Sequence, residues 1–207
     1  MAADAVRSPM RLLMLSCAAM VAFALVARTA DASIDGSAFM KDLGHRVLAL
    51  VDSGQPEPER EQQFRKLVQQ AFDVPAITRW VLGPYWRTAT AAQREEFGKS
   101  FENYMLRVYW SRFSTYHGET FRVLGQRSEG DGTILVRTEV LRPGGNQSPV
   151  KVSWRLIRRD GTFKIRDVSV AGVSQAETYR DEFTSIIDRN GGRVSALIDA
   201  LNRHAES

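Results

Sequence analysis

The sequence is poor in residues that build covalent or metal-bound scaffolds, with one cysteine and three histidines in 207 residues. A single cysteine, Cys17, can form no intramolecular disulfide and cannot supply the thiolates of a structural zinc site. His45, His117 and His204 lie far apart, and neither an H-E-x-x-H nor a Gly-rich nucleotide-binding motif occurs. We therefore expect no metal site and no cofactor, and also no cysteine nucleophile if Cys17 is removed with the N-terminal segment described below.

The sequence also lacks a strong excess of charge, since 28 Lys and Arg oppose 24 Asp and Glu for a formal net charge of +4. That excess is too small to indicate a nucleic-acid-binding protein. The apolar fraction of 43% and the charged fraction of 25% are typical of a globular protein and exclude a disordered chain. We therefore expect a folded chain with a substantial core.

Long apolar runs are absent except near the N-terminus, where residues 12–27 are mostly apolar. Arg7 and Arg11 precede this run, and the A-x-A pattern Ala30-Asp31-Ala32 follows it. A basic start, an apolar stretch and small residues at the exit are typical of a secretory signal. We predict that residues 1–32 are a cleaved signal peptide.

The remaining residues, 33–207, are predicted to form a single domain. An uncleaved membrane anchor is the alternative for the apolar run, but the run is short and only moderately apolar for a membrane span. Cys17 lies in the middle of the run rather than at its end, which disfavours a lipoprotein. Cleavage would leave the mature chain without cysteine.

Helical periodicity dominates the first half of the predicted domain. Apolar residues from Phe64 to Phe72 recur at i, i+3, i+4, i+7 and i+8, which predicts a one-sided amphipathic helix. The longest helix is predicted to begin at a capping box, Thr90 with Gln93, and to run to about Tyr116. Further helices are predicted over 35–51, 76–82, 179–187 and 194–201.

The apolar period changes from 3.6 to 2 after Gly118, which predicts strands containing 121–123, 134–140, 150–156 and 163–170. Short turns between consecutive strands require antiparallel pairing. The last strand changes phase, and one extra residue near Arg166-Asp167, a β-bulge, would correct it. The predicted fold class is α+β, with a four-stranded antiparallel sheet packed on one face by N-terminal and C-terminal helices.

One motif approaches an enzyme signature. Gly172 to Ala176 nearly matches the G-x-S-x-G nucleophile elbow around Ser174, and Asp188 or Asp199 and then His204 follow in hydrolase order. However, the fifth position is alanine, and that elbow belongs to mostly parallel sheets. Ser174 with Glu177 also reads as a capping box. We expect no enzyme, and a secreted esterase using Ser174 is the alternative of another class.

Two stretches carry a resemblance to a known family. Residues 64–97 contain FD-x-P-x-I, VLG-x-YWR and Q-R-x-E-F, and residues 167–192 contain G-V-S before YRDEF. Together these motifs resemble the periplasmic phospholipid carriers of the Mla system, the MlaC or toluene-tolerance family. That family includes members associated with hopanoid synthesis, so hopanoid is an alternative ligand to phospholipid.

The resemblance implies a soluble periplasmic shuttle that takes a lipid by its acyl tails into a pocket between sheet and helices. It implies exchange with an inner-membrane ABC lipid transporter and its substrate-presenting subunit. It also implies exchange with an outer-membrane lipoprotein–porin assembly. It implies no enzymatic activity. A third reading, a structural or adaptor protein with a filled core and no ligand, stays open.

The apolar and aromatic surplus supplies candidates for the walls of such a pocket, because a sheet half covered by helices can hold an apolar ligand between its layers. Apolar periodicity indicates candidate wall residues on the helices and on the inward face of the sheet. The predicted lipid-binding residues are Trp80, Leu82, Tyr85, Phe101, Met105, Val136, Val152 and Trp154. Each of them is equally a candidate for the ordinary core.

Four basic residues of the predicted strands, Arg137, Lys151, Arg155 and Arg158, are expected on the outer face or an edge of the sheet. Positive charge there could meet anionic headgroups or an acidic docking partner. An ordinary solvated sheet face is the alternative for each residue.

Overall fold

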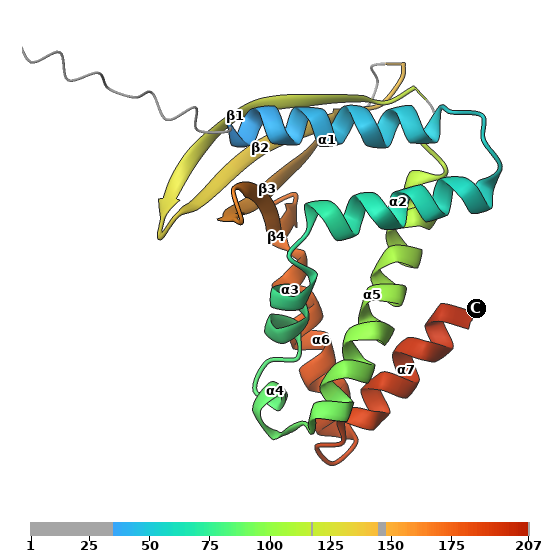
Figure 1. Ribbon diagram of the computed structural model, residues 1–207, viewed down its shortest axis with the longest axis vertical. Coiled ribbons are helices and arrows are strands. Elements are labelled where there is room, and N and C mark those ends of the chain that lie inside the picture. The colour runs from blue at the N-terminus through green and yellow to red at the C-terminus, as the bar shows by residue number, and fades with distance from the viewer. Residues whose placement is uncertain (1–34, 117, 145–147, 207) are drawn as a thin grey trace, which may run out of the picture. The chain divides into compact units, whose positions relative to one another are not determined.

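The computed structural model describes residues 35–116, 118–144 and 148–206 (Figure 1). The predicted signal peptide, 1–32, lies outside these residues, so its cleavage stays a prediction. Within the described ranges no helix has the length and apolar character needed to cross a membrane.

Helices come before and after the strands along the described chain. The first group comprises α1 (Gly36–Val51), α2 (Glu57–Ala71), α3 (Val74–Val81), α4 (Tyr85–Thr88) and α5 (Ala91–Phe113). The strands are β1 (Thr120–Gly130), β2 (Thr133–Leu141), β3 (Val150–Arg159), β4 (Thr162–Val170) and β5 (Val173–Ser174). The chain ends with α6 (Gln175–Arg189) and α7 (Val194–Glu206).

The start of α5 confirms the predicted capping box. The Gln93 backbone N–H donates to the Thr90 hydroxyl over 3.1 Å, and the Thr90 backbone N–H donates to Gln93 Oε1 over 3.0 Å. Two N–H groups that a helix start leaves without partners are thereby satisfied. The cap fixes where this 23-residue helix begins.

The strands form one antiparallel sheet in the order β1-β2-β3-β4-β5. Arg155 pairs with Asp167 while the next residue, Leu156, pairs with Ile165, so Arg166 is the extra residue of a β-bulge. This confirms the bulge predicted from the phase change. It restores the apolar residues on both sides of the bulge to one face of β4.

The α+β class and the antiparallel sheet are confirmed, but the sheet has five strands rather than four. The missed strand, β5, is only two residues long, so it shows no alternation that a sequence pattern could reveal. It follows a tight turn in which Ala171 and Gly172 both have positive φ, 50° and 87°. Val173 and Ser174 then pair back onto the end of β4.

Helices contact the sheet from more than one side rather than covering a single face. In Figure 1, α1 lies along β1 and β2, with α2 beside it. Met40 and Leu43 of α1 pack there against Val136, Leu156 and other inward residues of the sheet. On the other face of β4, Asp167 accepts a hydrogen bond of 3.2 Å from the backbone of Ala176 at the start of α6.

A second core lies among the helices. It packs Phe97, Phe101 and Leu106 of α5 against Phe183 and Ile187 of α6, together with residues of α2, α3 and α7. The rings of Phe97, Phe101 and Phe183 stand 5.7 to 5.9 Å apart between centroids, within the range of favourable aromatic pairs. Figure 1 shows α3, α5, α6 and α7 side by side in this group.

The segment between α2 and α3 joins the helical group to the edge of β4. The Asp73 backbone N–H donates to the Ile165 carbonyl over 2.9 Å, and the Asp73 carboxylate accepts from Arg159 over 2.9 Å. The Asp73 side chain is 2% exposed. A buried carboxylate needs such a partner, so this pair fixes α3 against the sheet.

For two glycines within helices, we predict that substitution by alanine changes the free energy of unfolding in opposite directions. A Cβ on Gly44 of α1 would lie 2.5 Å from Cδ1 of Phe121, whereas a Cβ on Gly98 of α5 would meet nothing closer than Thr78 Cγ2 at 3.7 Å. We expect Gly98→Ala to raise the free energy of unfolding by about 0.5–1 kcal/mol through helix propensity. Gly44→Ala should lower it by about 1–3 kcal/mol, because the Phe121 ring must move. Urea unfolding measures the free energy of unfolding of both variants. An equal increase of this free energy in Gly44→Ala and Gly98→Ala would show that α1 and β1 are not in close contact.

Candidate functional site

An apolar cavity of about 240 Å³ lies between the sheet and helices α1, α2 and α5. Its walls are built from the apolar stripe of each helix and from the inward side chains of four strands. From the helices come Met40, Leu43, Val47, Leu48, Phe64, Leu67, Val68, Phe72, Met105 and Phe113. From β1 to β4 come Phe121, Val140, Val150, Val152, Trp154, Val168 and Val170.

The polar residues of the lining are gathered in one stretch of the chain. Tyr109, Arg112 and Tyr116 belong to the end of α5 and the turn after it, and Glu119 and Thr120 lead into β1. The rest of the lining offers hydrocarbon almost throughout. The cavity therefore has one polar end and otherwise apolar walls, the arrangement expected for a ligand with a long apolar part.

Three residues of the lining are exposed: Arg112, Thr120 and Val170. The other lining residues are buried or half-buried. Val170 is 36% exposed, which is unusual for a valine on the inward face of a sheet. The cavity therefore meets solvent beside these three residues, next to its polar end.

Trp154 is the one tryptophan of the cavity wall, and its polar atom is satisfied inside the sheet. Its indole N–H donates to the Thr138 hydroxyl over 2.8 Å, and that hydroxyl donates to the Val152 carbonyl over 3.3 Å. Thr138 is fully buried. This chain of bonds satisfies the buried N–H and fixes the ring as a hydrocarbon wall.

A pair of tyrosines links the cavity wall to α6. Tyr109 lines the cavity, and its hydroxyl shares a hydrogen bond with the hydroxyl of Tyr179 on α6. Burial raises the pKa of both hydroxyls above the ordinary value of 10.0, and the nearby positive charge of Arg112 opposes the rise. Both groups therefore stay protonated and neutral beside the apolar walls at neutral pH.

Of the eight residues predicted to bind lipid, the structure brings three together in the cavity wall: Met105, Val152 and Trp154. Three others lie in the two cores. Leu82 and Phe101 are fully buried among the helices, and Val136 is fully buried beneath α1. Core packing accounts for these three, because side chains from neighbouring elements already fill the space around them.

The remaining two, Trp80 and Tyr85, lie in the helical group outside the cavity lining. Trp80 is 48% exposed, and the guanidinium of Arg180 stands 4.6 Å from its ring centroid. The hydroxyl of Tyr85 bonds the carboxylate of Asp188, which raises the Tyr85 pKa. A role in lipid binding stays a prediction for all eight residues.

Sequence reasoning missed the contribution of α1 and α2 to the cavity. Leu43, Val47 and Leu48 of α1, and Phe64 and Leu67 of α2, all line it. Their helical spacing is visible in the sequence, but the same spacing describes a helix packed on a filled core. A signal for a cavity rather than a core is therefore absent from the periodicity itself.

The motif around Ser174 has a structural explanation. Ser174 is 8% exposed and caps α6, with its hydroxyl accepting from the Glu177 backbone N–H over 3.1 Å. Two other residues of the suggested triad, Asp188 and His204, contact side chains away from Ser174. Asp188 bonds Tyr85, and the His204 ring lies 6.2 Å from the ring of Tyr104.

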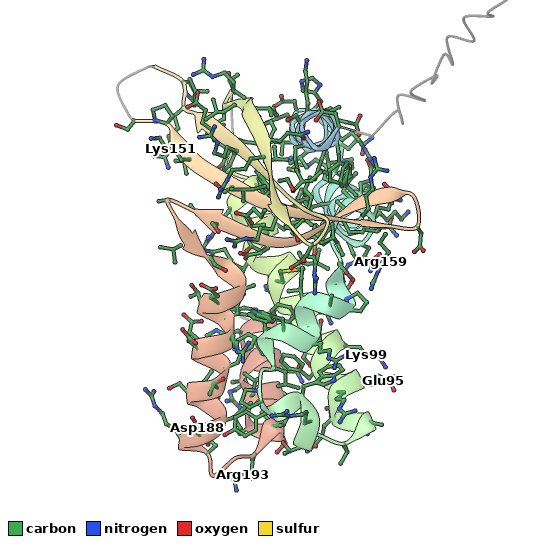
Figure 2. The ribbon with its side chains drawn as sticks, turned by 90° about the vertical axis from the view of Figure 1, so that its left-hand side faces the viewer. Glu95, Lys99, Lys151, Arg159, Asp188 and Arg193 are labelled. Atoms are coloured by element: carbon green, nitrogen blue, oxygen red, sulfur yellow. The ribbon has the colours of Figure 1, made fainter. Side chains whose placement is uncertain are left out.

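The four basic residues of the strands do not act as one patch. The strand register puts Arg137, Lys151 and Arg155 on the face opposite the cavity, where Arg155 bridges Glu129 and Asp167 at 2.9 Å each. Arg158 instead lies over the ring of Phe163, 5.4 Å from its centroid. Figure 2 shows Lys151 at the sheet end of the molecule.

Comparison with known proteins decides the family. The family model described as MlaC protein matches residues 41–203, most of the chain. The chain belongs to the MlaC family. The intermembrane phospholipid transport system binding protein MlaC of Haemophilus influenzae is 22% identical over 189 residues, 87% of each chain.

Two further relatives agree with this assignment. The toluene tolerance protein ttg2D of Pseudomonas putida is 26% identical over 137 residues, 66% of this chain and 63% of that protein. A phospholipid-binding protein from Ralstonia solanacearum, solved in complex with a phospholipid, has a TM-score of 0.70 at 24% identity. The match covers 83% of this chain and 97% of that one, so the MlaC-family chain shares its fold.

The tyrosine pair predicts a loss of stability in alkali. Because the pKa of each hydroxyl is raised in the folded state, the unfolded chain releases these protons first as the pH rises through the ordinary value of 10.0. The stabilisation is therefore complete below that pH and declines above it. We expect the free energy of unfolding, measured in urea between about pH 8 and pH 11, to fall less steeply in the double variant Tyr109→Phe, Tyr179→Phe. An unchanged slope would show that these hydroxyls titrate normally.

The capping role of Ser174 gives a separate prediction. Ser174→Ala should lower the free energy of unfolding by about 1 kcal/mol, because the Glu177 N–H loses its acceptor. Ser174→Asp, which keeps a capping oxygen, is the matched control and should retain most of the stability. Ester hydrolysis by the wild-type protein that disappears in Ser174→Ala would instead support the esterase alternative.

Proposed function

We propose that this MlaC-family chain is a periplasmic lipid carrier that encloses phospholipid acyl chains in the cavity between the sheet and helices α1, α2 and α5. The observation that carries the proposal is the cavity itself, about 240 Å³ in volume and lined almost entirely by hydrocarbon. It exceeds the roughly 150 Å³ of a dry engineered cavity that accepts benzene. Close packing of the core does not account for such a space, because protein interiors hold few voids larger than a water molecule.

The energetics of lipid transfer explain why a carrier needs this cavity. Each buried CH₂ contributes roughly 0.8 kcal/mol, so exposing a 16-carbon tail to water costs on the order of 12 kcal/mol. Apolar walls can replace the bilayer for such a tail without specific bonds. Met40 and Met105 suit this role, because methionine adapts its shape to an irregular apolar partner.

The relatives support phospholipid as the ligand. The Haemophilus protein is named for intermembrane phospholipid transport, and the Ralstonia protein was solved with a phospholipid bound. The polar end of the cavity at Arg112, Glu119 and Thr120 suits a headgroup that stays in water while the tails are enclosed. Hopanoid, also apolar with a small polar end, is the alternative ligand of the same cavity.

The proposed carrier works as the soluble component of an ABC-type lipid transport system. It would exchange lipid with an inner-membrane transporter through the substrate-presenting subunit, and with an outer-membrane lipoprotein–porin assembly. The signal-like residues 1–32 support export to the periplasm. The family relationship and the cap at Ser174 favour a carrier over an enzyme.

Three residues of the sequence prediction, Met105, Val152 and Trp154, are also lipid-binding residues in our proposal. To these the cavity adds residues of α1 and α2, of which Leu48 and Leu67 are half-buried and face the cavity. Neither leucine belongs to the fully buried part of a core. They are therefore suitable positions for narrowing the cavity without emptying or overfilling a core.

The test is organic extraction of the purified protein followed by mass spectrometry. We expect about one equivalent of phospholipid in the wild type, and at least a fivefold lower occupancy in Leu48→Trp and Leu67→Trp, because an indole would occupy the space of the tails. Leu124→Trp is the matched control, since Leu124 is 46% exposed and lies outside the cavity lining. Circular dichroism confirms that each variant is folded.

Two results would contradict the proposal. Wild-type protein that carries no lipid, even after incubation with phospholipid vesicles, would favour the structural or adaptor alternative. Equal occupancy in Leu48→Trp, Leu67→Trp and Leu124→Trp would show that lipid binds elsewhere on the protein. If the extract contains hopanoid instead of phospholipid, the protein is still a lipid carrier, but its ligand is hopanoid.

A further inference from the structure

A second, strongly basic groove lies in the helical group. It is lined by residues of α3, the turn after α3, α4, α5, β3, β4 and α6. Its ionisable residues are Arg79, Arg94, Lys99, Arg159, Arg166 and Arg180 against Glu95 and Glu102. This is six positive against two negative side chains, an excess of four that equals the formal net charge of the whole chain. We name this surface the arginine groove.

Some of these charges are already neutralised. Lys99 bonds Glu95 over 2.7 Å, and Arg159 bonds the buried Asp73 over 2.9 Å. Figure 2 shows Glu95, Lys99 and Arg159 along one side of the molecule. The second carboxylate of the groove, Glu102, accepts a hydrogen bond from the Gln69 amide over 2.6 Å.

Four arginines of the groove have no carboxylate partner within the described part of the chain: Arg79, Arg94, Arg166 and Arg180. Arg94 donates from Nη2 to the Arg87 carbonyl over 3.3 Å, while its Nε is buried and has no acceptor among the described residues. A buried N–H of a charged group without an acceptor is costly, so an acceptor from another molecule would be stabilising.

Two of these arginines are held against tryptophans. The guanidinium of Arg180 lies 4.6 Å from the ring centroid of Trp80, and that of Arg94 lies 5.3 Å from the ring of Trp86. Stacking occupies the face of a guanidinium and leaves its N–H edge available to acceptors. Arg94 uses part of that edge for the Arg87 carbonyl, whereas Arg180 has no carboxylate partner among the described residues and is oriented in advance for an anionic one.

The same surface carries an exposed aromatic side chain. Trp80 is 48% exposed beside the four unpaired arginines. Tryptophan and arginine are enriched among the residues that contribute most to protein–protein binding. Of the described residues, none lines both the arginine groove and the apolar cavity, so the groove is not the headgroup end of the lipid site.

We propose that the arginine groove is a docking surface for an acidic segment of a partner protein. Charge complementarity identifies the partner's chemistry: several carboxylates for the four guanidiniums that lack a carboxylate partner among the described residues, and an apolar or aromatic side chain for Trp80. A protein segment satisfies both requirements at once, whereas a single inorganic anion satisfies only the first. This inference goes beyond the proposed lipid-carrier function and stands without it.

The test uses full-length purified protein and a labelled peptide of ten residues in which Glu and Asp alternate around one Phe. We expect this peptide to bind the wild type and to change the emission of the groove tryptophans. The double variant Arg79→Glu, Arg180→Glu should weaken binding at least tenfold, because it turns two attractions into repulsions. Binding should also weaken steeply between about 50 and 300 mM salt.

Controls separate this site from general attraction to a basic protein. Arg193→Glu changes the charge by the same amount per residue at an exposed position outside the groove (Figure 2), and it should weaken binding less than twofold. A peptide with Gln and Asn in place of Glu and Asp should not bind. Lipid occupancy of the double groove variant should equal that of the wild type, so failure of this proposal is distinguishable from failure of the carrier function.

Three results would overturn the proposal. Equal affinity of the acidic peptide for the wild type and the double groove variant would show that the groove does not bind it. Inorganic phosphate that binds as tightly as the peptide would make the groove a small-anion site. Phosphatidylglycerol vesicles that bind through the same arginines, when the peptide does not, would identify a membrane-facing surface.

Discussion

The cavity depends on one constraint: the sheet and the helical group have separate, fully packed cores that do not merge. Met40, Leu43 and Ala71 pack with the inward face of the sheet, while Phe97, Phe101 and Phe183 fill the space between helices. Each core is filled by its own side chains, so neither can move into the other without breaking close packing. Phe72, at the end of α2, packs against both cores and also lines the cavity between them. The open space therefore results from two closely packed cores rather than from one loosely packed core.

Keeping this space open has an energetic cost that a ligand can remove. At about 24 cal/mol per Å³, an empty apolar cavity of this size costs about 6 kcal/mol, comparable with the whole stability of an ordinary domain. A lipid tail restores the lost contacts, so the loaded form is the more stable one by linkage. Two polar groups of the wall add little to this cost, because Trp154 is bonded within the sheet and Tyr109 shares a hydrogen bond with Tyr179. Glu119 differs, because its Oε2 is buried without a hydrogen-bond partner among the described residues.

The sequence predicted what local chemistry determines. Thr90 with Gln93 indicated the start of the longest helix, and the phase change around Arg166 indicated the bulge, because both are encoded within a few residues. The wall of the cavity is not encoded in this way. Phe101 and Met105 are one turn apart on the same stripe of α5, yet Phe101 is fully buried among helices while Met105 reaches the cavity. Periodicity identifies the apolar face of an element, but only the angle between elements decides whether that face meets another side chain or an open space.

The two sites share β3, β4 and one helix, α5, which lines the arginine groove with its first turns and the cavity with its last. Arg94 and Lys99 lie in the groove, and Met105, Tyr109 and Arg112 lie in the cavity. A straight helix of 23 residues is about 35 Å long and moves largely as a rigid rod. The α5 helix is also packed on α7, α3 and α2, so a rotation that adjusts the groove must repack those contacts. The same rotation would shift Met105 and Tyr109 against the sheet. A partner held in the groove would therefore contact one of the three helices that border the space for a lipid tail.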